Sequence, residues 1–286
     1  MSPLGLIAGG GLMPLRVADA CAKSGRPVFA ILVEGFADPA AWTAHPHEVI
    51  RLGAIGRMVA TLRARQVRQI VLAGRIRRPA LLSFGFDAEG VRLLARVGRR
   101  AILGGDDGLL SAVLRVAREE GFEPVGAQEV LADLLVPPGP LTRTRPDEQA
   151  LADIARGVLV CRMLGHADAG QACVVQQGLV LALEGIEGTD AMLARCGELR
   201  REGPGGVLVK TVKPGQDTRV DLPAIGPDTV RSAAVAGLRG IVIEGRSGNA
   251  GTILLDRDAT ISAAEAAGLF LLAIRPEDHL PKEENA

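Results

Sequence analysis

Short apolar runs alternate with segments of helical periodicity as far as about residue 135. The runs 5–10, 27–35 and 69–74 are rich in apolar residues and end at a glycine, which is typical of buried strands. Residues 13–23 and 107–120 carry apolar side chains three or four apart, which favours helices that bury one face. Such alternation favours βαβ units and a mostly parallel sheet. Weaker signals predict a strand at 47–52 and a helix at 57–65.

A Pro- and Gly-rich segment at 137–146 separates this region from the remainder of the chain. The pattern therefore predicts an N-terminal α/β domain at 1–136, a linker at 137–146 and a C-terminal catalytic α/β domain at 147–286. The fold class that we expect is α/β in two domains, with a Rossmann-like parallel sheet in the first. In the second domain we expect helices at 147–164, 227–236 and 261–267, and strands at 172–184, 206–212, 240–245, 251–256 and 269–274.

The composition excludes several classes of protein. The 33 Lys and Arg residues balance 33 Asp and Glu residues, so no overall charge attracts nucleic acid. Aromatic residues make up 2% of the chain, too few for a base-stacking surface. No apolar run approaches the length of about 20 residues that spans a membrane, and no signal peptide is recognisable. We expect a cytoplasmic protein whose four cysteines, none in a C-x-x-C pair, are free thiols.

Glycines after the first strand form the first candidate site. Gly9, Gly10 and Gly11 would let backbone N–H groups approach a phosphate at a helix N-terminus. Pro14 stands where a dinucleotide-binding fingerprint has its third glycine, although Glu34 could hold a ribose hydroxyl. The alternatives are a nucleotide contact, a plain turn between strand and helix, and a less favoured NAD site.

Further polar residues follow other predicted strands or open predicted helices. Arg75 follows the strand at 69–74, where a guanidinium would suit phosphate oxygens. Asp106 and Asp107 precede a helix, so one would cap it while the other could face a metal or a sugar hydroxyl. Thr189 and Asp190 open another helix after a Gly-flanked loop, as caps or as ligand contacts.

The densest polar cluster lies between residues 209 and 226. Two lysines and an arginine there can neutralise a diphosphate, and a nearby carboxylate can bind Mg²⁺ or orient water. No histidine has the spacing of a zinc site, so carboxylates and substrate phosphates would hold Mg²⁺ or Mn²⁺. The candidates are Lys210, Lys213, Gln216, Arg219 and Asp221.

Taken together, these motifs resemble a known family over nearly the whole chain. It is the Mg²⁺-dependent UDP-2,3-diacylglucosamine diphosphatases of lipid A biosynthesis, the type unrelated to calcineurin-like phosphoesterases. The resemblance rests on GLIAGGGLMP, AGRIRRP, GGDDGLL and QEVL, and above all on GLVLALEGIEGTDAML and KPGQDTRVDLPAIGPDT.

The resemblance implies hydrolysis of UDP-2,3-diacylglucosamine to 2,3-diacylglucosamine 1-phosphate (lipid X) and UMP. It implies a ligand site between the two domains, with Mg²⁺ as cofactor. It also implies a homodimer at the cytoplasmic face of the inner membrane. The family's essential aspartate falls on Asp221. The other candidates would contact the substrate. Gly9–Gly11 would contact the nucleotide, and Thr189 and Asp190 would contact the sugar or its phosphate. The pyrophosphate would be bound by Lys210, Lys213 and Arg219, and further substrate contacts would come from Arg75, Asp107 and Gln216.

Two other functions remain open at this point. A non-enzymatic protein that binds nucleotide sugars or acyl lipids would use the same phosphate-binding residues. An NAD(P)-linked oxidoreductase is disfavoured by Pro14 and by the absence of tyrosine.

Overall fold

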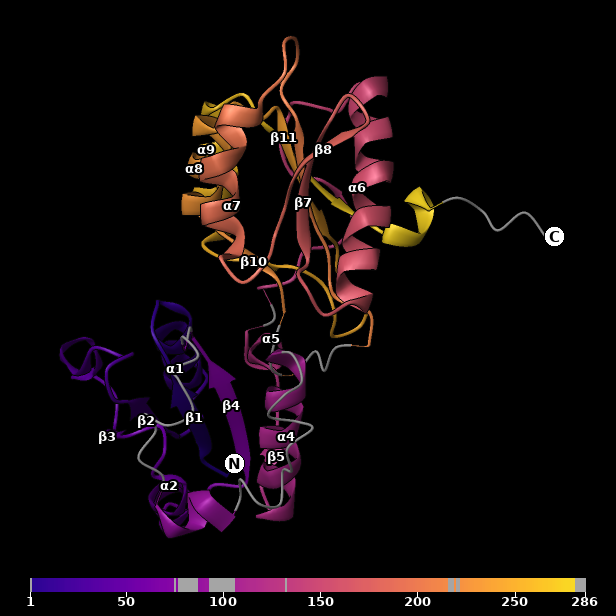
Figure 1. The fold of residues 1–286 in the computed structure, drawn as a ribbon. Helices are drawn as coiled ribbons and strands as arrows, with labels where there is room; N and C mark the ends of the chain where they lie inside the picture. The colour runs from indigo at the N-terminus through magenta and orange to yellow at the C-terminus, as the bar shows by residue number, and fades with distance from the viewer. Residues whose placement is uncertain are drawn as a thin grey trace. The chain divides into compact units, whose positions relative to one another are not determined.

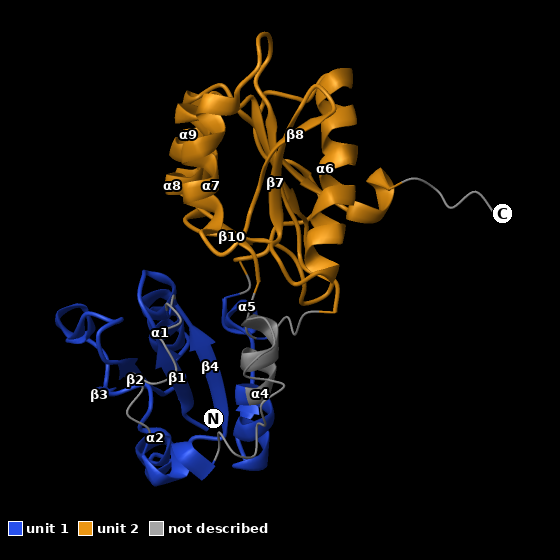
Figure 2. Cartoon of the chain, in the orientation of Figure 1, with its two compact units in different colours: residues 1–132, 217–220 blue, residues 133–216, 221–286 orange. Residues whose placement is uncertain are grey.

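The computed structural model describes residues 2–74, 76, 87–92, 106–131, 133–215, 219 and 222–280, without the side chains of 106–112. The chain divides into two compact units (Figure 2). The first comprises residues 1–132 and 217–220, and the second comprises 133–216 and 221–286.

The first unit contains a parallel sheet of five strands in the order β3-β2-β1-β4-β5. This confirms the predicted Rossmann-like sheet. The order places β1 and β4 side by side, with successive connections running away from them in opposite directions. The elements are β1 (Leu4–Ala8), α1 (Met13–Lys23), β2 (Val28–Val33), η1 (Pro39–Trp42), β3 (His47–Ile50), α2 (Ile55–Ala64), β4 (Gln69–Ala73), α4 (Asp106–Glu119), β5 (Glu123–Pro124) and α5 (Ala127–Val130).

Helices pack on both faces of this sheet because the strands are apolar on both faces, as parallel strands require. Met58 and Leu62 of α2 and Ala117 of α4 pack in one core with Phe29 and Ile31 of β2. The helix α1 packs against β1, β2 and α5.

The second unit contains a mixed sheet in the order β6-β13-β11-β9-β7-β8. The strands β9, β11 and β13 are parallel, whereas β6, β7 and β8 pair antiparallel. The elements are β6 (Gly139–Pro140), α6 (Glu148–His166), β7 (Ala172–Gln176), β8 (Leu179–Leu183), α7 (Gly188–Cys196), η3 (Gly197–Leu199), β9 (Val207–Lys210), β10 (Ala224–Ile225), α8 (Pro227–Val235), β11 (Gly240–Glu244), β12 (Ile253–Leu254), α9 (Arg257–Ala266), β13 (Phe270–Ile274) and η4 (Pro276–His279).

Two predicted segments of this unit differ from the structure. The strand expected over 172–184 is a hairpin, because Gln177 and Gly178 both have positive φ, the pattern of a tight type I′ turn. Residues 137–146, expected as a linker, include β6, which pairs with Leu272 and Ala273 of β13. This proline-rich stretch therefore adds an edge strand to the sheet.

The helix α6 covers one face of the sheet, and α7, α8 and α9 cover the other (Figure 1). Gly157 lets α6 approach closely, since a Cβ there would lie 2.4 Å from Val209 Cγ2. Side chains of β9 alternate between the two cores: Val207 and Val209 face α6, and Leu208 faces α7 to α9. Lys210, two residues after Leu208, lies on the same side of the strand as Leu208. All four cysteines are buried free thiols, as predicted.

Candidate active site

The glycines predicted to approach a nucleotide lie at the carboxyl end of β1, beside that of β4. The N–H of Gly9 donates to the carbonyl of Ala73 over 2.8 Å. A Cβ on Gly74 would lie 2.8 Å from the carbonyl oxygen of Gly10 and from Pro14 Cγ, so the two loops touch at backbone level. In an open parallel sheet, ligands bind where neighbouring connections diverge, which here is the edge between β1 and β4.

Pro14 departs from the dinucleotide fingerprint for a structural reason. It lies in the first turn of α1, where a proline's missing N–H leaves no hydrogen bond unmade. Glu34 directly follows β2 and is exposed. Two predicted contacts of this unit, Arg75 and the side chain of Asp107, lie outside the described residues.

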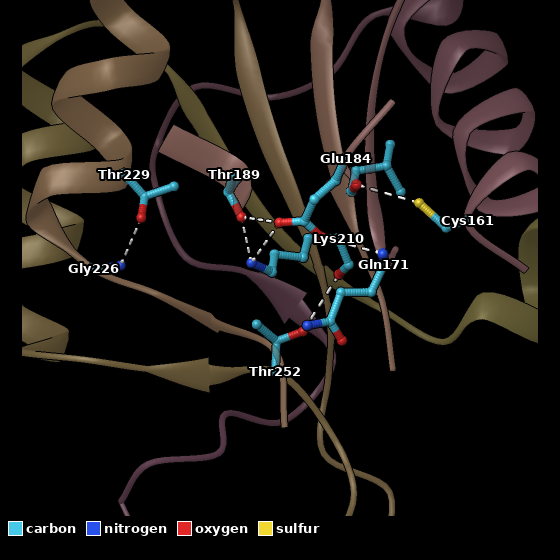
Figure 3. A network of polar contacts seen from close by, with 9 residues as sticks. Cys161, Gln171, Glu184, Thr189, Lys210, Gly226, Thr229 and Thr252 are labelled. Carbon is cyan, nitrogen blue, oxygen red and sulfur yellow. Dashed lines mark hydrogen bonds and ion pairs between the residues drawn. The ribbon is translucent and has the colours of Figure 1, made fainter. Parts of the chain in front are cut away.

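In the second unit, Lys210 and Thr189 meet at the carboxyl end of β9 (Figure 3). Lys210 Nζ donates to Thr189 Oγ1 over 2.6 Å, and the same hydroxyl donates to Glu184 Oε1. Lys210 Nζ lies 3.6 Å from Glu184 Oε1, and the two charged side chains are 7% and 8% exposed. The structure thus brings together a lysine and a threonine that were predicted separately.

Backbone groups hold this cluster from its other side. The N–H of Gln171 donates to Glu184 Oε2 over 3.2 Å. Thr252 donates to the carbonyl of Lys210 and accepts the N–H of Glu244, which ties β9 to β11. The buried amide oxygen of Gln171 accepts no hydrogen bond from the described residues.

Glu184 was missing from the predicted site residues. It directly follows β8, ahead of the Gly-flanked loop that leads to Thr189. The available signal in the sequence was an acidic residue directly after an apolar strand, because a charge that becomes buried there needs a partner. For Thr189 and Asp190, a helix cap was the alternative to a ligand contact. The structure does not show that cap, since α7 begins at Gly188 without a side-chain cap.

Lys213 lines a pocket whose lining residues do not include Lys210. Its Nζ donates to Asp168 Oδ1 over 2.9 Å, just beyond the end of α6. The pocket has a volume of about 330 Å³, and Arg162, His166, Glu244 and Glu277 are among the side chains that line it. The structure therefore does not join the two lysines in one described cluster.

Burial raises the pKa of the Glu244 carboxyl, and the negative charge of Glu277 adds to this effect. The N–H of Val212, which donates to Glu244 Oε2, and the charge of Arg162 oppose it. The pocket thus combines cations with a carboxyl group that is more easily protonated than an exposed glutamate.

The described contacts do not test several other predicted site residues. Gln216 and Asp221 lie outside the described residues, and Arg219 is half-buried. The side chain of Asp190 is exposed. Within the described ranges, no three His, Cys, Asp or Glu side chains gather as a metal site would require. No helix of the described part combines the length and the apolar character needed to cross a membrane.

Comparison with known proteins assigns both units. The family model "LpxI N-terminal domain" matches residues 3–134, and "LpxI C-terminal domain" matches residues 137–272. The chain belongs to the LpxI family. A LpxI protein of Caulobacter vibrioides, named UDP-2,3-diacylglucosamine pyrophosphatase LpxI, is 42% identical over 285 residues, which cover 97% of this chain and 99% of the relative. The Lys210 cluster lies within the match to the LpxI C-terminal domain, and the Gly9–Gly11 loop lies within the match to the N-terminal domain.

Proposed function

We propose that this protein hydrolyses the pyrophosphate bond of UDP-2,3-diacylglucosamine, which yields 2,3-diacylglucosamine 1-phosphate and UMP. The observation that carries the proposal is the buried, hydrogen-bonded ammonium of Lys210 at the carboxyl end of β9. The full-length similarity to a relative named for this substrate supports it. A non-enzymatic role in lipid or nucleotide-sugar binding is the alternative that the experiment below separates.

A buried ammonium suits the electrostatics of this reaction. When a P–O bond of a pyrophosphate breaks, negative charge moves onto the leaving phosphate. A fixed cation that water does not screen stabilises such charge far more than an exposed lysine would. Lys210, at 7% exposure, fits this role, and Lys213 and Arg219 would add positive charge to the pyrophosphate.

The first unit would bind the nucleotide. Its Gly9–Gly11 loop opens onto the start of α1, where backbone N–H groups favour phosphate. The side-by-side placement of β1 and β4 supports this assignment, and Arg75, which follows β4, would add a guanidinium. In the second unit, Asp190 would contact the sugar phosphate or a sugar hydroxyl, and Gln216 would contact the substrate. Asp107, at the start of α4 in the first unit, is a further proposed substrate contact.

Mg²⁺ is the cofactor that we propose, with Mn²⁺ as a substitute, and Asp221 is the residue that would hold it. In enzymes that act on phosphates, Mg²⁺ often binds through one or two carboxylates together with the substrate's phosphates. When bound, the metal would neutralise phosphate charge.

We also propose that the protein acts as a homodimer at the cytoplasmic face of the inner membrane. The membrane location follows from the chemistry of the substrate and the lipid product, since both carry two acyl chains that keep them in or near a bilayer. The homodimer follows only from the family resemblance. Sedimentation with vesicles that contain the substrate, and light scattering of the purified protein, test these two points.

The deciding experiment follows UMP and lipid X released by the purified protein in Mg²⁺ and in EDTA. We expect both products to appear in equal amounts and only with metal. Asp221→Ala should abolish release while circular dichroism stays unchanged, and Asp258→Ala, at an exposed position of α9, should leave release unchanged. Substrate that stays bound but uncleaved by the wild-type protein would favour the binding role, and normal turnover by Asp221→Ala would refute the role of Asp221.

A further inference from the structure

The hydroxyl of Thr189 stands between the charges of Glu184 and Lys210 (Figure 3). An ionised carboxylate only accepts hydrogen bonds and an ammonium only donates them. The single hydroxyl proton of Thr189 therefore goes to Glu184 Oε1, and a lone pair on Thr189 Oγ1 accepts from Lys210 Nζ. The direction of both hydrogen bonds, from Lys210 to Thr189 and from Thr189 to Glu184, therefore follows from the chemistry of the groups as well as from the distances.

This arrangement places a negative charge near Lys210 while only one of the three ammonium protons is donated to a described side chain. The 3.6 Å between Lys210 Nζ and Glu184 Oε1 exceeds the length of an N–H···O hydrogen bond. Glu184 thus supplies a nearby negative charge, while Thr189 takes one of the three ammonium protons. Within the described residues no other side chain takes a proton from Lys210.

The carboxylate is itself held in place. The N–H of Gln171 donates to Glu184 Oε2, so the carboxylate is fixed at both oxygens. Removing either charge of a buried pair leaves the other without compensation, which makes the pair interdependent.

We propose that Glu184 is a positioning residue for the reaction, which acts on the substrate phosphate through Thr189 and Lys210. Glu184 fixes the direction of the ammonium, and Thr189 acts as a spacer that leaves two N–H groups of Lys210 for phosphate oxygens. Thr189 is then not a phosphate donor, because its proton is committed to Glu184. The proposal rests on the proposed pyrophosphatase function.

Four single variants test it in the full-length protein with UDP-2,3-diacylglucosamine and Mg²⁺. Thr189→Val removes the hydroxyl at nearly constant volume and lets Glu184 contact Lys210 directly. Thr189→Ser keeps the spacer, and Glu184→Gln removes the charge. Glu187→Gln is the matched control, because Glu187 lies in the same loop but pairs with the exposed Arg195.

We expect Thr189→Val and Glu184→Gln each to lower kcat by about tenfold or more with a smaller change in KM, since the charge interacts most strongly with the transition state. Thr189→Ser should stay within about threefold of the wild type, because a hydroxyl alone restores the spacer. Glu187→Gln should match the wild type. Thermal denaturation of each variant separates these effects from loss of folding, and Thr189→Val tests the spacer even if Glu184→Gln does not fold.

Wild-type kinetics in Glu184→Gln would overturn the proposal, since the carboxylate would then be dispensable. A loss in Thr189→Ser as large as that in Thr189→Val would overturn it as well, because the hydroxyl would not explain the effect. No release of UMP by the wild-type protein would instead refute the proposed function, and the role of Glu184 with it.

Discussion

Two glutamines of the second unit differ in how their side-chain amides are satisfied. The buried oxygen of Gln171 accepts no hydrogen bond from the described residues. Gln176 is fully buried, donates to the carbonyls of Arg201 and Pro204, and accepts the N–H of Arg201. A buried polar group without a hydrogen-bond partner destabilises the fold, so its removal costs little. Removal of a buried polar group that has partners is costly, because those partners are left unpaired.

We therefore expect Gln171→Met to leave the free energy of unfolding unchanged or slightly higher. Gln176→Met, the same substitution five residues along, should lower the free energy of unfolding by about 1–3 kcal/mol. The reason is that this substitution leaves two carbonyls and an N–H without hydrogen-bond partners. Urea denaturation of both variants measures the difference. A loss in Gln171→Met equal to that in Gln176→Met would show that the oxygen of Gln171 is hydrogen-bonded in the folded protein.

The contact between α6 and the sheet depends on the lack of a side chain at Gly157. A Cβ there would lie 2.4 Å from Val209 Cγ2 and 2.9 Å from Val209 Cβ. Gly157→Ala gains about 1 kcal/mol of helix propensity, but overpacking a core costs typically 1–3 kcal/mol. We expect the overpacking to prevail and the second unit to lose stability.

A second substitution at the contacting residue checks this cause. Val209→Ala removes the methyl groups that a Cβ on residue 157 would meet. Gly157→Ala should therefore destabilise less in the Val209→Ala background than in the wild type, a non-additivity that a double-mutant cycle measures. Equal effects in the two backgrounds would contradict the steric explanation.

Most elements could be predicted from the sequence because their apolar periodicity is local. The hairpin of β7 and β8 was missed because Gln177-Gly178 lies inside an otherwise apolar run and is not a typical turn pair. The strand β6 was missed because its partners, Leu272 and Ala273, lie far along the chain.

The candidate site could be predicted only in part. Lys210 and Thr189 were found from motif chemistry, but only the fold shows that they touch. Glu184 follows β8, and its proposed role depends on its contacts with Thr189 at the start of α7 and with Lys210 at the carboxyl end of β9. No local sequence pattern predicts that these three segments meet. The two lysines, three residues apart in the sequence, lie in different described environments because the strand ends between them.

On the scale of the whole molecule, each unit buries its own core around its own sheet. A cluster of buried side chains covers one face of the first sheet, and two others cover the two faces of the second. No strand of one sheet pairs with the other among the described residues. Because the cooperative unit of unfolding is usually a single core, we expect the two units to unfold in separate transitions.

The chain carries separate probes for each unit. Trp42, the sole tryptophan, is 2% exposed in the first unit, where Cys21 is also buried. Cys161, Cys173 and Cys196 are buried in the second. Pulsed thiol labelling with peptide mass spectrometry thus reports on both units, and tryptophan fluorescence on the first alone.

Gly157→Ala, which perturbs the core beneath α6, should lower the urea midpoint for labelling of Cys161 and Cys173. The midpoints for Trp42 fluorescence and for labelling of Cys21 should stay at their wild-type values, because the atoms nearest to a Cβ on residue 157 belong to Val209, in a core of the second unit. An equal shift of all four midpoints would show that the units unfold as one. In that case the free energy lost at Gly157 would be shared by the whole chain, and the site in each unit would depend on the stability of both.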